Sequence, residues 1–356
     1  MISLYLASSQ AYAGKTLIGL ALAQRYLEKG VKVGYFKPIG ALPLLAEAAH
    51  IDEDVPFIKD TLGLQEPAEL LSPLVLTDEL IHSALQEPGD SAREKVRAAY
   101  EQVSRGKDLM LVGGAGQALS RGALFGLSGP EMAELLDLKV LLIGDFNSLL
   151  DLDATVATAE AFGARLFGAV LNRVPEDRLG SLRGEIIPRL QAKGLQVLGA
   201  LPADALLHAI SLRELAESLG AKVLCAEDRL GELVENFIIG AMTLDSALVR
   251  FRQMENKAVI TGGDRSDIII AALQTPTTCL ILTGNLPPSP AVKARAAELG
   301  VPMLLVGEDT ISTVERIERL VSALRVREPR KLARARELVE SCLDLSRLDA
   351  LIGLSE

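Results

Sequence analysis

The sequence predicts an α/β protein in which a doubly wound parallel sheet is followed by a smaller α/β domain. Short apolar runs alternate with helical stretches over the first 210 residues. Strands that are apolar without a break are typical of a parallel sheet with both faces covered. The first run, the first helix and the second run follow in β-α-β order, which predicts a right-handed crossover.

The individual elements follow from the same pattern. A strand is expected at residues 2–7 and a helix with apolar periodicity at 16–29. The other expected strands of the first domain are residues 31–36, 108–112, 139–143, 166–171 and 196–201. A second α/β domain is expected to have a helix at 212–217 and strands at 222–225, 258–260, 279–282 and 302–306.

The pattern divides the chain into three parts. Residues 1–210 form the first domain and residues 211–325 the second. Residues 326–356 read as a C-terminal helical extension of mixed charge, which is expected to pack on the second domain or on a partner chain.

Composition and charge exclude several classes of protein. Hydrophobic residues make up 49% and charged residues 24%, the mix of a soluble globular protein. The net charge of −10 repels nucleic acid and anionic lipid, and only 4% of residues are aromatic. Three widely spaced cysteines without a CxxC pair indicate neither a zinc site nor a disulfide framework. With no apolar run of about 18 residues and no basic leader, we expect a cytoplasmic protein that binds neither nucleic acid nor membranes.

The most informative segment joins the first strand to the first helix. Residues 6–16 read LASSQAYAGKT, so a loop of small residues leads into Gly14 and Lys15 at a helix start. Loop N–H groups and a helix N-terminus form a cradle for anions. Gly14 allows a phosphate to approach the backbone, Lys15 supplies charge to the β and γ phosphates, and Thr16 offers a hydroxyl to Mg²⁺. Because Ser9 stands where the strict pattern has glycine, a generic strand–helix turn is the alternative.

A second lysine strengthens the prediction of a phosphate site. Lys37 follows the second predicted strand and precedes Pro38, which stiffens the chain. The carboxyl ends of the strands of an open parallel sheet face the ligand crevice. Lys15 and Lys37 are therefore expected at the same edge and are the candidate catalytic residues, whereas the alternative for Lys37 is a solvated loop lysine.

Residues 1–210 resemble the dethiobiotin-synthetase-like P-loop family, in the version found at the N-terminus of long bacterial phosphotransacetylases. The resemblance lies in GKT at 14–16, FKPI at 36–39, DED at 52–54, FIKDTLGL at 57–64, LSPLVLT at 71–77, GGAG at 113–116 and GAVLNRV at 168–174. It implies ATP and Mg²⁺ as cofactors, with a nucleotide cradle formed by Ser9, Gln10, Ala11, Tyr12, Ala13, Gly14, Lys15, Thr16 and Leu17.

The same resemblance implies roles for other residues. Thr16 and Asp54 bind Mg²⁺, Lys37 meets the substrate, and Asn172 helps to hold adenine. Asp52 is a second metal candidate, because an extended segment would place it on the same face as Asp54.

Two departures from the family pattern argue against full ligase chemistry. A metal-binding Glu of the family is Gly113 here, and the glycine that opens the family's loop is Ser8. Phosphoryl transfer depends mainly on positioning and charge neutralisation, so a missing ligand affects turnover more than binding.

Residues 211–325 resemble the DRTGG domain, a small module that also occurs in long phosphotransacetylases and some regulated pyrophosphatases. The string DRTGG is absent, and GGDRS at 262–266 is its nearest counterpart. Arg265 could bind a phosphate or carboxylate bidentately, or Asp264 and Arg265 could fix the loop or a dimer contact. The resemblance implies a regulatory module that pairs as a homo-dimer or takes a small-molecule effector. The candidate contact residues are Gly262, Gly263, Asp264, Arg265, Thr283 and Gly284.

Three functions remain open from the sequence. The first is an ATP- and Mg²⁺-binding protein, at most a weak ATPase, with a ligand-sensing or dimerising second domain in acetyl-phosphate or acetyl-CoA metabolism. The second is an ATP-dependent ligase related to dethiobiotin or cobyrinic acid diamide synthase, and the third is a scaffold with an empty P-loop. A chain of 356 residues is not expected to be a complete phosphotransacetylase, and the sequence does not separate ATP from GTP.

Overall fold

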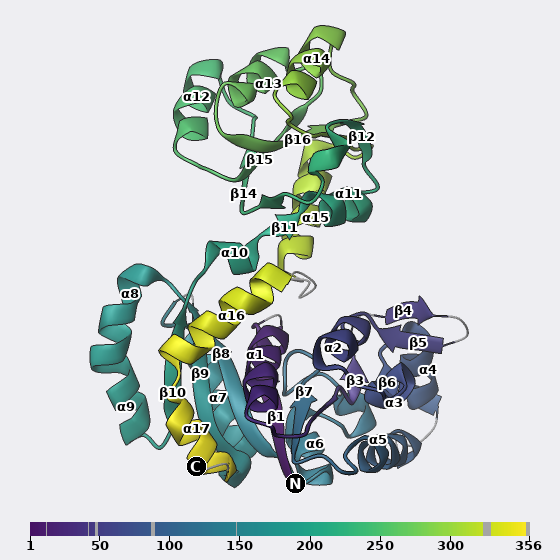
Figure 1. Cartoon of the computed structure of the whole chain (residues 1–356), viewed down its shortest axis with the longest axis vertical. Helices are drawn as coiled ribbons and strands as arrows, with labels where there is room; N and C mark the ends of the chain where they lie inside the picture. The colour runs from purple at the N-terminus through teal and green to yellow at the C-terminus, as the bar shows by residue number, and fades with distance from the viewer. Residues whose placement is uncertain are drawn as a thin grey trace. The chain divides into compact units, whose positions relative to one another are not determined.

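The structure, a computed structural model, describes the chain except residues 12, 42, 47–48, 87–89, 147, 323–328 and 354–356. The chain forms two compact units (Figure 1). Unit 1 comprises Met1–Ala203 together with Val326–Glu356, and unit 2 comprises Asp204–Arg325. Unit 2 is thus inserted between two parts of unit 1. Among the described residues, none of the helices has the length and apolar character that a membrane span requires.

The core of unit 1 is a six-stranded parallel sheet in the order β10-β9-β8-β1-β7-β2. β1 lies inside the sheet, and the chain runs from it first to β2 on one side and later to β8 on the other. This topology confirms the predicted doubly wound parallel sheet. The strands are β1 (Ile2–Ser8), β2 (Val33–Phe36), β7 (Leu109–Gly113), β8 (Lys139–Asp145), β9 (Leu166–Val174) and β10 (Val197–Pro202).

Helices and short strand pairs complete the described part of unit 1. Two pairs, β3 with β6 and β4 with β5, lie outside the main sheet and were not expected, because such short segments carry no clear alternation. The short strands are β3 (Ile39–Gly40), β4 (Pro43–Ala46), β5 (Ala49–Asp52) and β6 (Leu74–Val75). The helices of the first part are α1 (Lys15–Glu28), α2 (Val55–Leu62), α3 (Ala68–Leu71), α4 (Asp78–Gln86), α5 (Asp90–Val103), α6 (Gly129–Leu135), α7 (Asp151–Phe162), α8 (Glu176–Ser181) and α9 (Ile187–Ala192).

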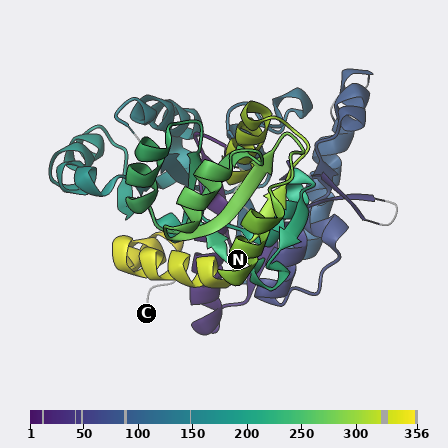
Figure 2. The ribbon, with the colours of Figure 1, turned by 90° about the horizontal axis from the view of Figure 1, so that it is seen from above.

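The C-terminal helices belong to unit 1. Helix α16 (Pro329–Cys342) packs against α1 and β10, and α17 (Leu345–Ile352) packs against β10. Figures 1 and 2 show the yellow α16 beside the purple α1. A Cβ on Gly199 of β10 would lie 2.3 Å from the carbonyl oxygen of Cys342, so the close approach requires glycine. The described helices of the extension therefore pack on unit 1, a position that the sequence did not indicate.

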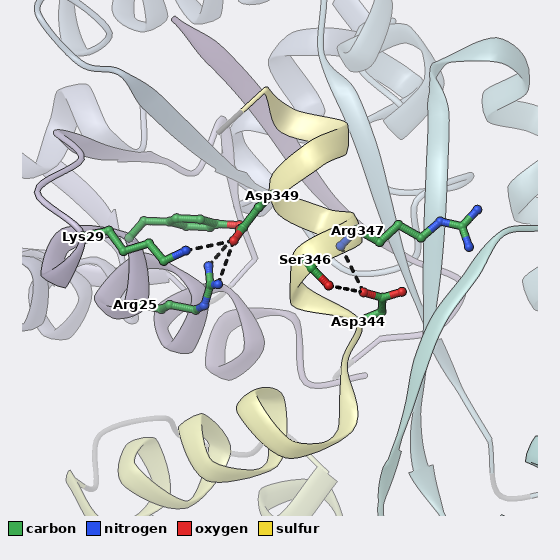
Figure 3. A network of polar contacts seen from close by, with 7 residues as sticks. Arg25, Lys29, Asp344, Ser346, Arg347 and Asp349 are labelled. Carbon is green, nitrogen blue, oxygen red and sulfur yellow. Dashed lines mark hydrogen bonds and ion pairs between the residues drawn. The ribbon is translucent and has the colours of Figure 1, made fainter. Parts of the chain in front are cut away.

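A polar cluster, which we call the C-terminal clasp, ties α17 to the last turn of α1 (Figure 3). The Asp349 carboxylate accepts two hydrogen bonds of 2.8 Å from Arg25, one of 2.8 Å from Tyr26 Oη and one of 2.9 Å from Lys29 Nζ. Burial alone would raise the pKa of Asp349, but the hydrogen bonds from Arg25, Lys29 and Tyr26 lower it to about 2. The clasp consists of Arg25, Tyr26, Lys29 and Asp349.

The start of α17 is fixed by Asp344 (Figure 3). Asp344 Oδ1 accepts hydrogen bonds from the backbone N–H of Arg347 at 3.0 Å and from Ser346 Oγ at 2.9 Å, which caps the helix. The backbone N–H of Asp344 donates to the carbonyl of Leu198 in β10 at 2.8 Å. The helix therefore begins at the point where the chain joins the edge of the sheet.

Unit 2 is a smaller α/β unit around a five-stranded sheet in the order β12-β17-β16-β15-β14. Strands β14 to β17 are parallel, and β12 is antiparallel to β17. Buried apolar side chains cover both faces of the sheet, with α11 and α15 on one face and α12, α13 and α14 on the other. Figure 2 shows helices on both sides of the green strands. The elements are α10 (Ala205–His208), β11 (Ile210–Ser211), α11 (Leu212–Leu219), β12 (Lys222–Cys225), β13 (Leu233–Val234), β14 (Asn236–Ile239), α12 (Leu244–Arg252), β15 (Lys257–Gly262), α13 (Ser266–Leu273), β16 (Thr277–Thr283), α14 (Pro290–Glu298), β17 (Met303–Leu305) and α15 (Thr310–Ser322).

Candidate phosphate-binding site

The loop between β1 and α1 has the backbone geometry that the sequence predicts. Gly14 is the residue before α1, and its φ of 88° lies in the left-handed region that favours glycine. A Cβ on Gly14 would lie 2.5 Å from Nδ2 of Asn172. Glycine is therefore required here both by the turn into α1 and by the side chain beneath it.

Lys15 is buried at the carboxyl edge of the sheet and is held by neutral oxygens. Its Nζ donates to Ser8 Oγ at 2.6 Å and to the carbonyl of Gly116 at 3.4 Å, and the residue is 8% exposed. Burial first, and then the nearby Lys37 and Arg173, lower the pKa of Lys15 to about 7, against the opposite effect of Asp54. A bound anion would stabilise the charged form of this lysine.

Ser8 explains one departure from the family pattern. Its side chain is fully buried, and Ser8 Oγ lies 2.6 Å from the carbonyl oxygen of Gln10 and 2.9 Å from that of Gly116, so its single proton is donated to one of the two. The same oxygen accepts the hydrogen bond from Lys15. The serine thus connects the loop, the lysine and the segment after β7, a role that glycine could not fill.

Lys37 forms a buried ion-pair cluster with two carboxylates. Its Nζ lies 2.6 Å from Asp52 Oδ1 and 2.9 Å from Asp54 Oδ2. Burial opposes the charged form of Lys37, but the carboxylates of Asp54 and Asp52 raise its pKa above the ordinary value. From the sequence, Asp52 and Asp54 are expected on one face of an extended segment. Instead, Asp52 ends β5 and Asp54 lies in the turn that precedes α2, and both reach the same ammonium.

The carboxylates that are predicted to bind magnesium contact another side chain in this structure. The two carboxylates are already bound by Lys37. Within the described residues there is no group of three or more His, Cys, Asp or Glu that could hold a metal ion. The assignment of Mg²⁺ to Thr16, Asp54 and Asp52 stays a prediction.

The end of β9 supports the loop from below. Asn172 Nδ2 donates to the carbonyl of Ala13 at 2.9 Å, so the amide predicted to hold adenine contacts the loop itself. The next residue, Arg173, has a left-handed φ of 57°, and its Nε lies 3.5 Å from Asp145 Oδ1. The sequence analysis did not single out Arg173, although its place at the carboxyl end of a predicted parallel strand could have indicated it.

The remaining cradle residues are placed in different ways. Ser9 Oγ lies 3.4 Å from Thr155 Oγ1, and Gln10 Nε2 donates to Asp151 Oδ1 at 3.0 Å. Both side chains therefore contact α7. Leu17 is 6% exposed, so its side chain belongs to the buried core. Ala11, Ala13 and Thr16 are at least partly buried, and Tyr12 lies outside the described residues.

The candidate residues of unit 2 gather at the carboxyl edge of its sheet. Gly262 of β15 and Thr283 of β16 are register partners, and Gly284 follows directly. Arg265 donates to both carboxylate oxygens of Asp267, at 3.1 and 3.0 Å, and to the carbonyl of Met242 at 3.3 Å.

Two further contacts join the loops at that edge. A Cβ on Gly263 would lie 1.6 Å from the carbonyl oxygen of Leu286, so these loops touch. Thr283 Oγ1 lies 2.8 Å from Thr310 Oγ1, which begins α15. The structure therefore places these candidate residues of unit 2 at one edge of its sheet. Whether they bind a small molecule or form a dimer contact stays a prediction.

The fold and the loop define a class of protein. A strand ends in a glycine-containing loop that leads into a helix through Gly-Lys-Thr, within a doubly wound parallel sheet. This is the architecture of a P-loop domain of the NTPase type. Residues 3–211 match the AAA_26 family model, described as an AAA domain, and the chain belongs to this family. Residues 214–320 match the model of the DRTGG domain, which confirms the second resemblance.

Relatives that align with nearly the whole chain carry the name phosphate acetyltransferase. The protein of Synechocystis is 26% identical over 368 residues, which cover 97% of this chain and 51% of that protein. The protein of Nitratidesulfovibrio vulgaris is 27% identical over 370 residues, again 97% of this chain and 51% of the relative. The chain therefore spans about half the length of the curated relatives it matches.

Solved structures are similar to parts of the chain at low identity. The CBS and DRTGG domains of the regulatory region of Clostridium perfringens pyrophosphatase, complexed with the activator diadenosine tetraphosphate, are 20% identical, with a TM-score of 0.30. This match covers 45% of this chain and 75% of that chain. The MinC:MinD cell division protein complex of Aquifex aeolicus is 18% identical, with a TM-score of 0.35, over 58% of this chain and 84% of that chain.

Proposed function

We propose that unit 1 binds a nucleoside triphosphate, with ATP as the expected ligand, at the loop between β1 and α1. The observation that carries this proposal is the arrangement around Lys15, which is buried with only neutral oxygens at hydrogen-bond distance of its Nζ among the contacts described. Lys37 and Arg173 lie close enough to lower the pKa of Lys15. A polyphosphate at this place would meet the ammonium of Lys15 and the N–H groups at the start of α1. Lys37 and Arg173 lie nearby and are paired with carboxylates.

The proposed role is regulatory. The curated relatives are named phosphate acetyltransferase, and the chain matches about half of their length. We therefore assign the nucleotide site and the DRTGG domain to the control of acetyl-phosphate or acetyl-CoA metabolism, with at most slow hydrolysis of ATP. A small-molecule effector or a dimer contact at the loops around Arg265 belongs to the same proposal.

Calorimetric titration with ATP and with GTP tests the nucleotide site. Lys15→Ala should abolish binding, because it removes the buried charge of the cradle. The matched control is Lys193→Ala, which removes an exposed lysine at the C-terminal end of α9 in the same unit. Unchanged affinity in Lys15→Ala would place the nucleotide elsewhere. If the wild-type protein shows neither binding heat nor a rise in melting temperature with nucleotide, the loop is empty and the scaffold function is favoured.

A further inference from the structure

Lys37 lies between two carboxylates that the sequence offers as Mg²⁺ ligands, Asp54 through the resemblance and Asp52 through its expected position on the same face. The side chains of Lys37, Asp52 and Asp54 are 7%, 0% and 13% exposed. Asp52 Oδ1 also accepts the backbone N–H of Asp54 at 3.1 Å, and Asp52 Oδ2 accepts the backbone N–H of Ala41 at 2.9 Å. Both oxygens of Asp52 are therefore engaged, and the Lys37 ammonium offsets one of the two carboxylate charges that would attract a divalent ion.

The packing around Asp52 is also tight. A Cβ on Gly40 would lie 2.7 Å from Asp52 Cβ and 2.9 Å from its Oδ2. Mg²⁺ requires near-octahedral ligands at about 2.0–2.1 Å and keeps several of its waters. Such a shell at these carboxylates would require Lys37 to leave, and a buried carboxylate that loses its ammonium is strongly destabilised.

At position 113, the glutamate of the family pattern would clash with a tyrosine. A Cβ on Gly113 would lie 2.3 Å from Tyr35 Oη and 3.1 Å from Tyr35 Cζ. Tyr35 is 2% exposed in β2, next to β7, which carries Gly113. The phenol of Tyr35 therefore occupies the space that the Cβ of a glutamate at position 113 would need.

We propose that Lys37 is the fixed cation of this site, so that a nucleoside triphosphate binds with an affinity that does not depend on Mg²⁺. The inference rests on the proposed function. The protein offers Mg²⁺ no carboxylate in this cluster that Lys37 does not already bind. An ion that enters with the nucleotide is then held by phosphate oxygens and water, and it adds little to the affinity. Thr16 contributes at most a neutral hydroxyl.

The test is a pair of calorimetric titrations of the full chain with ATP, one in excess Mg²⁺ and one in EDTA. The ratio of the two affinities is expected to lie within about threefold of one, which is about 0.7 kcal/mol or less. A wild-type affinity that rises about tenfold or more with Mg²⁺ overturns the inference but leaves the proposed nucleotide site intact. No binding in either buffer overturns both.

Two variants identify the cation. In Lys37→Met the freed carboxylates become available, so the ratio should rise to about tenfold or more in favour of Mg²⁺. Asp54→Asn should leave the ratio near one, because the carboxylate it removes holds no metal. Lys193→Met is the matched control with an unchanged ratio. A ratio that stays near one in folded Lys37→Met contradicts the assigned role of Lys37. If that variant does not fold, the wild-type and Asp54→Asn ratios still decide.

Discussion

Removal of the carboxylate of the C-terminal clasp should destabilise unit 1 in a pH-dependent way. In the perturbation Asp349→Asn, the partners Arg25, Tyr26 and Lys29 keep their positions but lose a charged acceptor. The pKa of Asp349 is lowered from 3.8 to about 2, and the residue is 8% exposed. At about 1.4 kcal/mol per pKa unit, this shift corresponds to about 2 kcal/mol of unfolding free energy near neutral pH.

The pH dependence has a definite sign. A carboxyl group whose pKa is lower in the folded state contributes stability above its unfolded pKa, and this stability is lost as pH falls through the folded pKa. The difference between the wild-type protein and Asp349→Asn should therefore be about 2 kcal/mol at pH 6 and fall to roughly half of this at pH 3.

Urea denaturation followed by tyrosine near-ultraviolet circular dichroism is the assay. The chain has five tyrosines, all within the first 100 residues, and no tryptophan, so the signal reports on unit 1 alone. Glu101→Gln is the matched control, because Glu101 is exposed on α5 of the same unit. It should change the unfolding free energy by less than about 0.5 kcal/mol. The reasoning is refuted if Asp349→Asn behaves like this control at pH 6, or if its deficit is the same at pH 3.

Three further predictions concern the site and unit 2. Burial and nearby cations lower the pKa of Lys15 from 10.5 to about 7, so the folded state binds fewer protons than the unfolded state between these values and stability rises with pH. Lys15→Met should remove about 2–3 kcal/mol of this rise between pH 6 and 9 in EDTA without nucleotide, measured by urea denaturation; equal pH dependence in both proteins would contradict it. Asn172→Ala should lower the affinity for ATP, GTP and inorganic tripolyphosphate by the same factor in calorimetry, because Asn172 holds the loop through the carbonyl of Ala13. A loss of affinity for ATP alone would indicate that Asn172 recognises the base. Gly263→Ala should destabilise unit 2 by about 3 kcal/mol or more in hydrogen exchange, because its Cβ would lie 1.6 Å from the carbonyl oxygen of Leu286. A change below about 1 kcal/mol would show that the loop moves to accommodate the methyl group.

The sequence predicts the sheet well, because buried parallel strands leave continuous apolar runs. It predicts the turn into α1 for a related reason, because the left-handed conformation at Gly14 favours glycine. Contacts between distant segments are harder to foresee. No local pattern shows that Tyr35 occupies the space beside Gly113, or that Lys37 binds both Asp52 and Asp54.

The packing of the C-terminal extension could not be predicted from the sequence either. The sequence predicts that the extension is helical, but the pattern of an amphipathic helix does not indicate which surface covers its apolar face. The partners of Asp349 lie more than 300 residues away in the sequence. Only the fold brings that carboxylate to the helix that follows the phosphate loop.

A crystal structure of the protein with a non-hydrolysable ATP analogue tests the central claim most directly. The triphosphate should lie within hydrogen-bond distance of Lys15 Nζ and of backbone N–H groups between residues 13 and 17. A nucleotide bound at another place, or a loop still closed on Ser8 and Gly116 at saturating analogue, would contradict the claim.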